Sequence, residues 1–230
     1  MRRNVCVRRK SEYIYFPVLI DLRKFPCLVV GGGKVALRKV RSLLEFNAKV
    51  TVVSPRLSKG LIALSTESRI RIIRKPYSGT YIGENKLVFS ATDNREVNLR
   101  VSEDCKRKGV LLNVADGPAW CDFILPANVK RGSLIVSVSS QGKAPFFAQD
   151  TKKKLAAILP ASAADVAELA GEFRRRVLST GDGRSQAEKD KSYKKFLSTD
   201  WERILATKGK RKTYKYLEDI LRETVEMKDN

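Results

Sequence analysis

Five short apolar runs in the first half of the chain predict five β-strands. They lie at residues 27–30, 49–55, 69–74, 86–91 and 110–115. Apolar residues at helical spacing join the first run to the second, over residues 35–47, and the fourth to the fifth, through Val97, Val101 and Cys105. Strands that alternate with helices are typical of an α/β fold, so we expect a Rossmann-like, doubly wound parallel sheet.

The first apolar run ends in three consecutive glycines, Gly31-Gly-Gly33, and a helical pattern starts directly after them. Gly31 allows a tight turn, Gly33 lets the backbone come close to a phosphate, and Ala36 lets helix and strand pack closely. The helix that follows aims its free N–H groups and the positive end of its dipole at the anion. Because the glycines lie within a β-α-β unit of about 30 residues, they predict a dinucleotide site.

An acidic residue usually follows the second strand of such a unit and binds the ribose hydroxyls of NAD. This chain has Ser54-Pro-Arg56 at that point instead. Arg56 is suited to lie along the adenosine or to bind a 2′-phosphate. Residue chemistry alone therefore leaves both NAD and NADP open.

Residues that carry chemistry should gather where the strands end, because ligands of parallel sheets bind beyond the carboxyl ends of the strands. The segments concerned are 31–33, 54–56, 91–93 and 113–116. Asp116 is the best-placed candidate general base, since the Gly-Pro turn after it fixes the carboxylate and the chain has no histidine. Two plainer interpretations stay open: Asp116 only initiates a turn, and Asp93 only caps the next helix.

The net charge of the chain is strongly positive, with 46 Lys and Arg against 25 Asp and Glu, or +21. Such a surface indicates a partner with many negative charges, either nucleic acid or a polycarboxylate small molecule. The densest basic clusters lack the interleaved aromatic residues of a single-strand binding surface. We therefore expect no nucleic-acid partner and favour the small molecule.

Metal and membrane partners are not expected either. Cys6, Cys27, Cys105 and Cys121 are too scattered for a zinc site or a disulfide framework, and no imidazole can serve as a ligand. No segment reaches the roughly 18 apolar residues that a membrane helix needs. The basic N-terminus lacks the apolar run of a secretory signal, so we expect a cytoplasmic protein.

The pattern changes in the second half of the chain. Two extended runs, 123–127 and 133–140, predict a strand pair joined through residues 130–132, and helical stripes follow beyond Pro160. The stripes consist of Val166, Leu169, Ala170, Phe173 and Val177, and of Tyr214, Leu217, Leu221 and Val225. Exposed strand edges commonly pair with a second subunit, so we expect a homodimer with the strand pair in its interface.

This pattern predicts three parts: a nucleotide-binding domain at 1–121, a dimerisation and substrate-loop segment at 122–160, and a small helical domain at 161–230. Residues 139–145 end a strand and lead into a helix, so their hydroxyl and N–H groups are suited to bind an anion. Ser140 equally fits a plain helix cap. Lys143 either attracts a carboxylate or is merely solvated.

Several segments, in the same order, resemble the precorrin-2 dehydrogenase module of siroheme synthase. They are residues 16–23, the glycine turn through Lys39, Ala91-Thr-Asp-Asn94, Asn113-Val-Ala-Asp116, Phe123-Ile-Leu-Pro-Ala127 and residues 138–145. The resemblance extends from about Phe16 to Pro160 and is only general beyond that point. It implies NAD-dependent oxidation of precorrin-2 to sirohydrochlorin. In some members ferrous iron is then inserted as a second substrate to give siroheme, and the sequence leaves open which type this chain is.

The resemblance also implies roles for single residues. The family's catalytic aspartate falls on Asp116, and its substrate-loop serine falls on Ser140. We expect Asn113 and Lys143 to contact the substrate as well. The cofactor residues fall on Gly31, Gly33, Lys34, Val35, Pro55, Arg56 and Thr92. Since the family uses NAD, the resemblance favours NAD here despite the missing acid.

The charge of the chain agrees with this function, because precorrin-2 and sirohydrochlorin are polycarboxylates that a strongly positive protein attracts. With 230 residues the sequence has no room for the methyltransferase domain to which some relatives are fused, so we expect a separate enzyme to supply precorrin-2. Two other hypotheses are weaker. One is a nucleotide-sensing regulator that binds nucleic acid or acidic partners, and the other is a cofactor-binding module with a dead site.

Overall fold

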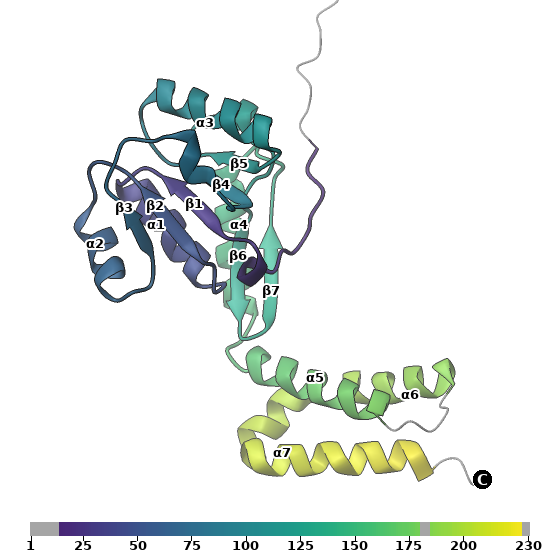
Figure 1. Cartoon of the computed structure of the whole chain (residues 1–230). Helices are drawn as coiled ribbons and strands as arrows, with labels where there is room; N and C mark the ends of the chain where they lie inside the picture. Colours follow the sequence, from purple (N-terminus) through teal and green to yellow (C-terminus); the bar gives the residue numbers. More distant parts are fainter. Residues whose placement is uncertain (1–13, 180–184, 227–230) are drawn as a thin grey trace, which may run out of the picture. The chain divides into compact units, whose positions relative to one another are not determined.

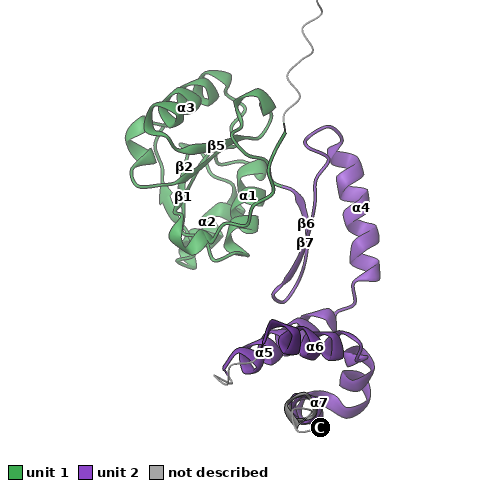
Figure 2. Ribbon diagram, turned by 90° about the vertical axis from the view of Figure 1, so that its right-hand side faces the viewer, with its two compact units in different colours: residues 1–125 green, residues 126–230 purple. Residues whose placement is uncertain are grey.

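A computed structural model describes residues 14–179 and 185–226, with side chains described up to residue 221 in the last helix. The basic N-terminal tail and residues 180–184 and 227–230 lie outside the described residues. The chain divides into two compact units, residues 1–125 and 126–230 (Figure 2). Each unit is described by itself.

The first unit contains a five-stranded parallel sheet. Its strands are β1 (Cys27–Val30), β2 (Val50–Val53), β3 (Arg71–Ile73), β4 (Leu87–Ser90) and β5 (Leu111–Val114). Their order across the sheet is β3-β2-β1-β4-β5, and every neighbouring pair is parallel. The predicted α/β fold with a Rossmann-like parallel sheet is confirmed.

Helices cover both faces of this sheet (Figure 1). Helices α1 (Lys34–Leu44) and α2 (Lys59–Thr66) pack on one face, whereas α3 (Arg95–Lys108) and the 3-10 turn η2 (Gly79–Ile82) pack on the other. Helix α2 has no counterpart among the predicted elements. Helix α1 ends before the predicted limit because Asn47 adopts a left-handed backbone conformation, with φ 56°.

The sheet forms the core of the unit because its central strands are buried on both faces. All four residues of β1 and of β4 are buried. Continuous runs of Val, Leu and Phe are what a sheet covered by helices on both faces requires. The two apolar layers meet α1 through Ala36 and Val40, and α3 through Val101 and Cys105.

The second unit starts with an antiparallel strand pair, β6 (Ala127–Arg131) and β7 (Leu134–Val138). Helix α4 (Pro145–Ile158) packs against both strands. The predicted strand pair is present, but its first strand begins where the predicted run 123–127 ends. Phe123 does not extend a strand because its ring packs edge-on against Phe89 of the first unit's sheet, with centroids 5.5 Å apart.

Three helices complete the second unit: α5 (Ala163–Ser179), α6 (Gln186–Leu197) and α7 (Trp201–Glu226), which is kinked at Gly209. Their buried core consists of Leu169, Phe173, Val177, Phe196, Trp201, Leu217 and Ile220. The predicted stripe of α5 is confirmed. In α7, Tyr214 is exposed, contrary to the prediction, and Tyr216 packs against the core instead. Val225 lies beyond the described side chains. None of the described helices has the length and apolar character needed to cross a membrane.

The helical core gives a stability prediction. Leu217 is fully buried, so Leu217→Ala should leave a cavity and lower the free energy of unfolding by about 2–5 kcal/mol. Leu197→Ala is the matched control, because Leu197 is 79% exposed and its truncation should change stability by less than about 0.5 kcal/mol. Urea denaturation followed by circular dichroism measures both. Equal effects of the two substitutions would contradict this core.

Candidate active site

A cavity of about 990 Å³ lies at the carboxyl ends of β1, β2 and β4, with Asp116 beyond β5 at its edge. Its size falls within the range of small-molecule sites, roughly 300–1,000 Å³. The order of the strands reverses between β1 and β4, and ligands of open α/β sheets bind at such a reversal. The cavity therefore occupies the sheet edge where the sequence predicts a crevice.

Gly31 makes the turn after β1 possible. Its backbone has φ +125°, which side-chain-bearing residues rarely adopt. A Cβ atom on Gly31 would lie 2.2 Å from the carbonyl oxygen of Ala91, at the end of β4. The turn can therefore cross the end of the neighbouring strand only as glycine, as predicted for this position.

Gly32 is equally restricted, although the sequence motif gave it no role. A Cβ atom here would lie 1.8 Å from the carbonyl oxygen of Arg56 and 2.7 Å from the hydroxyl oxygen of Ser54. The backbone N–H of Ser58 donates to the carbonyl oxygen of Gly32 over 2.8 Å. The loop after β2 is thus pressed directly against the glycine turn. The run of three glycines was the only available signal for this contact.

Gly33 has open space where the other two glycines are crowded. Apart from its neighbours in the chain, no atom of the described residues lies within 4 Å of the position that its Cβ would take, and Gly33 lines the cavity. It is also the N-cap of α1, and no side chain caps this helix or places an acid in its first turn. The first N–H groups of a helix lack intrahelical partners, so they are available to an anion here. These features fit the pyrophosphate of a dinucleotide.

The loop after β4 is held by Asn98 of α3, a residue that the sequence gave no reason to single out. Asn98 is buried; its amide oxygen accepts from the hydroxyl of Ser90 over 2.6 Å, and its amide nitrogen donates to the carbonyl oxygen of Thr92 over 3.1 Å. Thr92 is thereby fixed at the cavity wall. The interpretation of Asp93 as a helix cap is wrong: Asn94 caps α3 and accepts from the N–H of Val97.

Tyr77 and Arg100 complete the wall on the α3 side and were not predicted. The hydroxyl of Tyr77 donates to a carboxylate oxygen of Asp104 over 2.9 Å. Burial, reinforced by this carboxylate, raises the pKa of Tyr77, so the phenol stays protonated. The contact joins residues far apart in sequence, which is why local patterns did not reveal it.

Asp116 lies just beyond β5 and lines the cavity with an exposed side chain. The strand end before it is well anchored. The N–H of Ala115 donates to the carbonyl oxygen of Ser90, and the N–H of Val114 donates to the sulfur of Cys121 over 3.1 Å. Burial raises the pKa of the Cys121 thiol, so this sulfur remains a neutral structural partner. The exposed carboxylate of Asp116 thus follows a strand end that these hydrogen bonds hold in place.

Asn113 is predicted to contact the substrate, but it does not lie at the cavity. It is buried and does not line the cavity. Its amide nitrogen donates to the carbonyl oxygen of Phe123 over 3.0 Å, and its amide oxygen accepts from Nζ of Lys39 over 3.0 Å. Burial, together with the charge of Arg38, lowers the pKa of Lys39. Asn113 therefore ties β5 to α1 beneath the site.

Ser140 and Lys143 belong to the second unit. The N–H of Ala144 donates to the hydroxyl of Ser140 over 2.9 Å, and the N–H of Lys143 donates to the carbonyl oxygen of Ser140. The plain helix-cap interpretation of Ser140 needs correction, since the N-cap of α4 is Ala144. Ser140 instead closes the loop that leads into α4.

The structure gathers most of the predicted site residues around the one cavity. They are Gly31, Gly33, Lys34, Val35, Pro55, Arg56, Thr92 and Asp116. Asn113 lies beneath the site, and Ser140 and Lys143 lie in the other unit. The roles given to these residues remain predictions.

Known proteins provide a separate comparison. Residues 18–127 match a protein-family model described as "Putative NAD(P)-binding". The siroheme synthase of Ruthia magnifica is 39% identical over 163 residues, which cover 71% of this chain and 34% of that protein. The siroheme synthase of Saccharophagus degradans is 40% identical over 171 residues, or 73% of this chain and 37% of that protein. This chain is related to the siroheme synthases.

The resemblance that the sequence motifs predict is therefore confirmed. The chain spans about a third of the length of these curated relatives. A solved structure titled "SirC, precorrin-2 dehydrogenase" matches 89% of the chain and all of its own length, with a TM-score of 0.70 and 24% identity. That likeness shows a shared fold that includes the helical part. The family description supports the predicted nicotinamide cofactor and covers both NAD and NADP.

The neighbouring glycines Gly32 and Gly33 make a paired prediction. Gly33→Ala should leave thermal stability unchanged but weaken NAD binding about tenfold, because its Cβ would enter the cofactor space. Gly32→Ala should lower stability by about 1–3 kcal/mol, because the loop after β2 must move. Thermal melting and calorimetric NAD titration measure the two effects. A stable Gly33→Ala variant with unchanged NAD affinity would contradict this location of the pyrophosphate.

Proposed function

We propose that the chain catalyses the NAD-dependent oxidation of precorrin-2 to sirohydrochlorin. One observation carries the proposal: the cavity lined by the glycine turn also exposes the carboxylate of Asp116. A dehydrogenation needs a hydride acceptor and a proton acceptor side by side, and this cavity combines a candidate dinucleotide-binding site with a candidate base. The printed names of the relatives, siroheme synthase and precorrin-2 dehydrogenase, support the substrate.

The residues of the cavity divide between the two halves of the cofactor. The free N–H groups at Gly33, Lys34 and Val35 bind the pyrophosphate, and Pro55 and Arg56 lie along the adenosine. Thr92, held by Asn98, faces the other half. Bound NAD supplies the hydride acceptor. We propose NAD in preference to NADP because the sequence motifs resemble a family that uses NAD.

Asp116 is the proposed base. Precorrin-2 loses a hydride and a proton when it becomes sirohydrochlorin; two electrons pass with the hydride to NAD⁺, which becomes NADH, and Asp116 takes or relays the proton. The chain has no histidine, so a carboxylate is the natural group for this transfer. Of the two carboxylates that line the cavity, Asp116 has the strand end anchored by Cys121 beneath it, whereas Asp93 lies in the loop before α3.

Ferrous iron is the further substrate in the bifunctional members of the family. Insertion of iron displaces two pyrrole protons, and Asp116 is placed to accept them in turn. Within the part of the chain that the structure describes, no group of three or more His, Cys, Asp or Glu side chains gathers to hold a metal ion.

Ser140 and Lys143 are proposed to contact the substrate from the loop before α4, and Asn113 to position β5 beneath Asp116. The three-part division at residues 121/122 and 160/161 is proposed as the functional organisation. The positive charge of the chain favours a polycarboxylate substrate on electrostatic grounds.

The base assignment is tested with Asp116→Asn, which keeps the size of the side chain and removes its basicity. We expect NADH formation from precorrin-2 to fall about 10²–10⁴-fold, because general base catalysis contributes that much. Affinity for NAD should stay unchanged, which also verifies folding. Retained turnover in Asp116→Asn, with loss in Asp93→Asn, would make Asp93 the base.

Addition of ferrous iron after the first step tests chelation against a control with iron alone.

A homodimer is proposed through the strand pair. Among the described strands, β6 and β7 pair only with each other, so each has one edge that no other described strand covers, and such edges commonly pair with a second subunit. Sedimentation equilibrium should give twice the chain mass of 25.9 kDa. A monomer at micromolar concentration would contradict the proposed dimer without affecting the assignment of Asp116.

A further inference from the structure

A second cavity, of about 470 Å³, adjoins the cofactor cavity in the first unit. It is lined by Asp93, Arg95, Asn98, Asp116, Gly117, Pro118, Ala119 and Trp120. Asp93 and Asp116 line both cavities. A molecule in the second cavity would therefore meet the proposed base directly, beside the cofactor.

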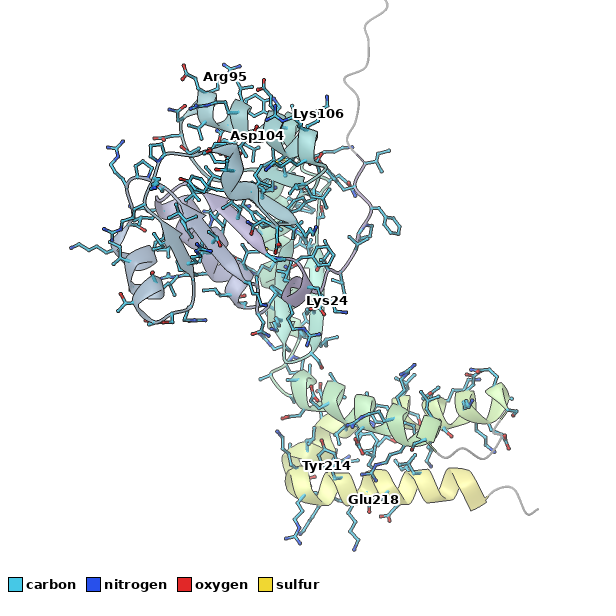
Figure 3. All side chains as sticks on the ribbon, viewed as in Figure 1. Lys24, Arg95, Asp104, Lys106, Tyr214 and Glu218 are labelled. Atoms are coloured by element: carbon cyan, nitrogen blue, oxygen red, sulfur yellow. The ribbon has the colours of Figure 1, made fainter. Side chains whose placement is uncertain are left out.

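Arg95 is the one cationic residue in the lining of this second cavity, and its position is electrostatically unfavourable. It is the first residue of α3, where the positive end of the helix dipole disfavours a cation. The other end of α3 follows the rule, with Lys106, Arg107 and Lys108 in its last turn. Figure 3 labels Arg95 and Lys106 towards opposite ends of the helix.

Arg95 has no partner among the described residues, in contrast to Arg107 and Lys108 in the last turn of the same helix. Arg107 pairs with Asp104, and Lys108 donates to the carbonyl oxygen of Gly79 over 2.8 Å. No residue of the described chain forms a hydrogen bond or ion pair with Arg95. Its guanidinium is exposed, lines the cavity and keeps all of its donors available.

The other walls of the cavity are held in place. Asn98 is buried and bonded to Ser90 and Thr92. Trp120 packs so closely on Gly117 that a Cβ atom there would lie 2.9 Å from the indole ring. The backbone N–H of Trp120 donates to the carbonyl oxygen of Gly117 over 3.0 Å. The cavity thus combines an apolar indole wall, two carboxylates and one unpaired guanidinium.

We propose that this second cavity binds the edge of the substrate macrocycle and that Arg95 anchors one of its peripheral carboxylates. The proposal rests on the proposed function. A tetrapyrrole of this kind presents N–H donors at its centre and carboxylates on its periphery, so it needs acceptors and a cation in one site. Asp93 and Asp116 face the N–H groups and the reacting carbon. Arg95 meets a carboxylate with the two parallel hydrogen bonds that its planar group favours.

The charges of the cavity are consistent with this division. Two carboxylates without a cation would repel a polyanion, whereas Arg95 offsets them at the side away from the reacting carbon. The site therefore selects the orientation of the substrate as well as its charge. Arg95 is a specificity-determining residue in this proposal, and Asp116 keeps the chemical role.

The test compares Arg95→Gln and Arg95→Lys with Lys106→Gln, a charge-matched control on the same helix. In steady-state assays with saturating NAD, Arg95→Gln should raise the KM for precorrin-2 about tenfold, with kcat and the KM for NAD unchanged within about twofold. Arg95→Lys should raise this KM less than Arg95→Gln does, because lysine keeps the positive charge. The recovery should be incomplete, because a lysine cannot form the bidentate pair. Lys106→Gln should behave as the unchanged protein.

A binding measurement separates the failure of this inference from the failure of the proposed function. Uroporphyrin, a stable polycarboxylate tetrapyrrole, is titrated into each variant and followed by its fluorescence. Weaker binding by Arg95→Gln alone supports the anchor. Equal KM values, or equal uroporphyrin affinities for Arg95→Gln and Lys106→Gln, overturn it. If the unchanged protein does not oxidise precorrin-2 at all, the proposed function fails, and the uroporphyrin comparison still decides whether Arg95 binds such a carboxylate.

Discussion

The lack of room for a side chain at two successive glycines is the constraint on which the site depends. Gly31 lies against the end of β4, and Gly32 lies against the carbonyl of Arg56. These contacts bring the turn after β1, the loop after β2 and the loop after β4 to one point of the sheet edge. The next glycine, Gly33, meets nothing, and the cavity opens there. The turn is thus crowded at two positions and open at the third.

The cavity walls are fixed by a few buried polar contacts that extend this constraint. Asn98 fixes the loop after β4, Cys121 fixes the end of β5, and Asn113 joins β5 to Lys39 of α1. The polar atoms of these supporting contacts have partners within the chain, whereas Arg56, Arg95 and Asp116 are exposed and line the cavities. This separation of supporting and binding groups is what a preorganised site needs.

Sequence patterns predicted the features that depend on residues close together in the chain. Apolar periodicity gave the parallel sheet, and the glycines gave the turn, because both depend on residues close in sequence. Helix α2 was missed because it is short, with only Leu61 and Leu64 buried. The start of β6 was wrong because the packing of Phe123 on Phe89 involves residues that are distant in sequence. The same reason hid the roles of Gly32, Tyr77 and Asn98, whereas the unpaired state of Arg95 cannot be inferred without coordinates.

The loop after β2 combines a fixed main chain with unrestricted side-chain identity at one position. The hydroxyl of Ser54 donates to the carbonyl oxygen of Arg56 over 2.6 Å, and Gly32 packs against the same carbonyl, but neither contact involves the guanidinium. A change of residue at position 56 would therefore alter the chemistry of the cavity wall without reshaping the loop. The side chain at this position can therefore change the chemistry beside the proposed cofactor, while the backbone contacts that shape the glycine turn stay the same.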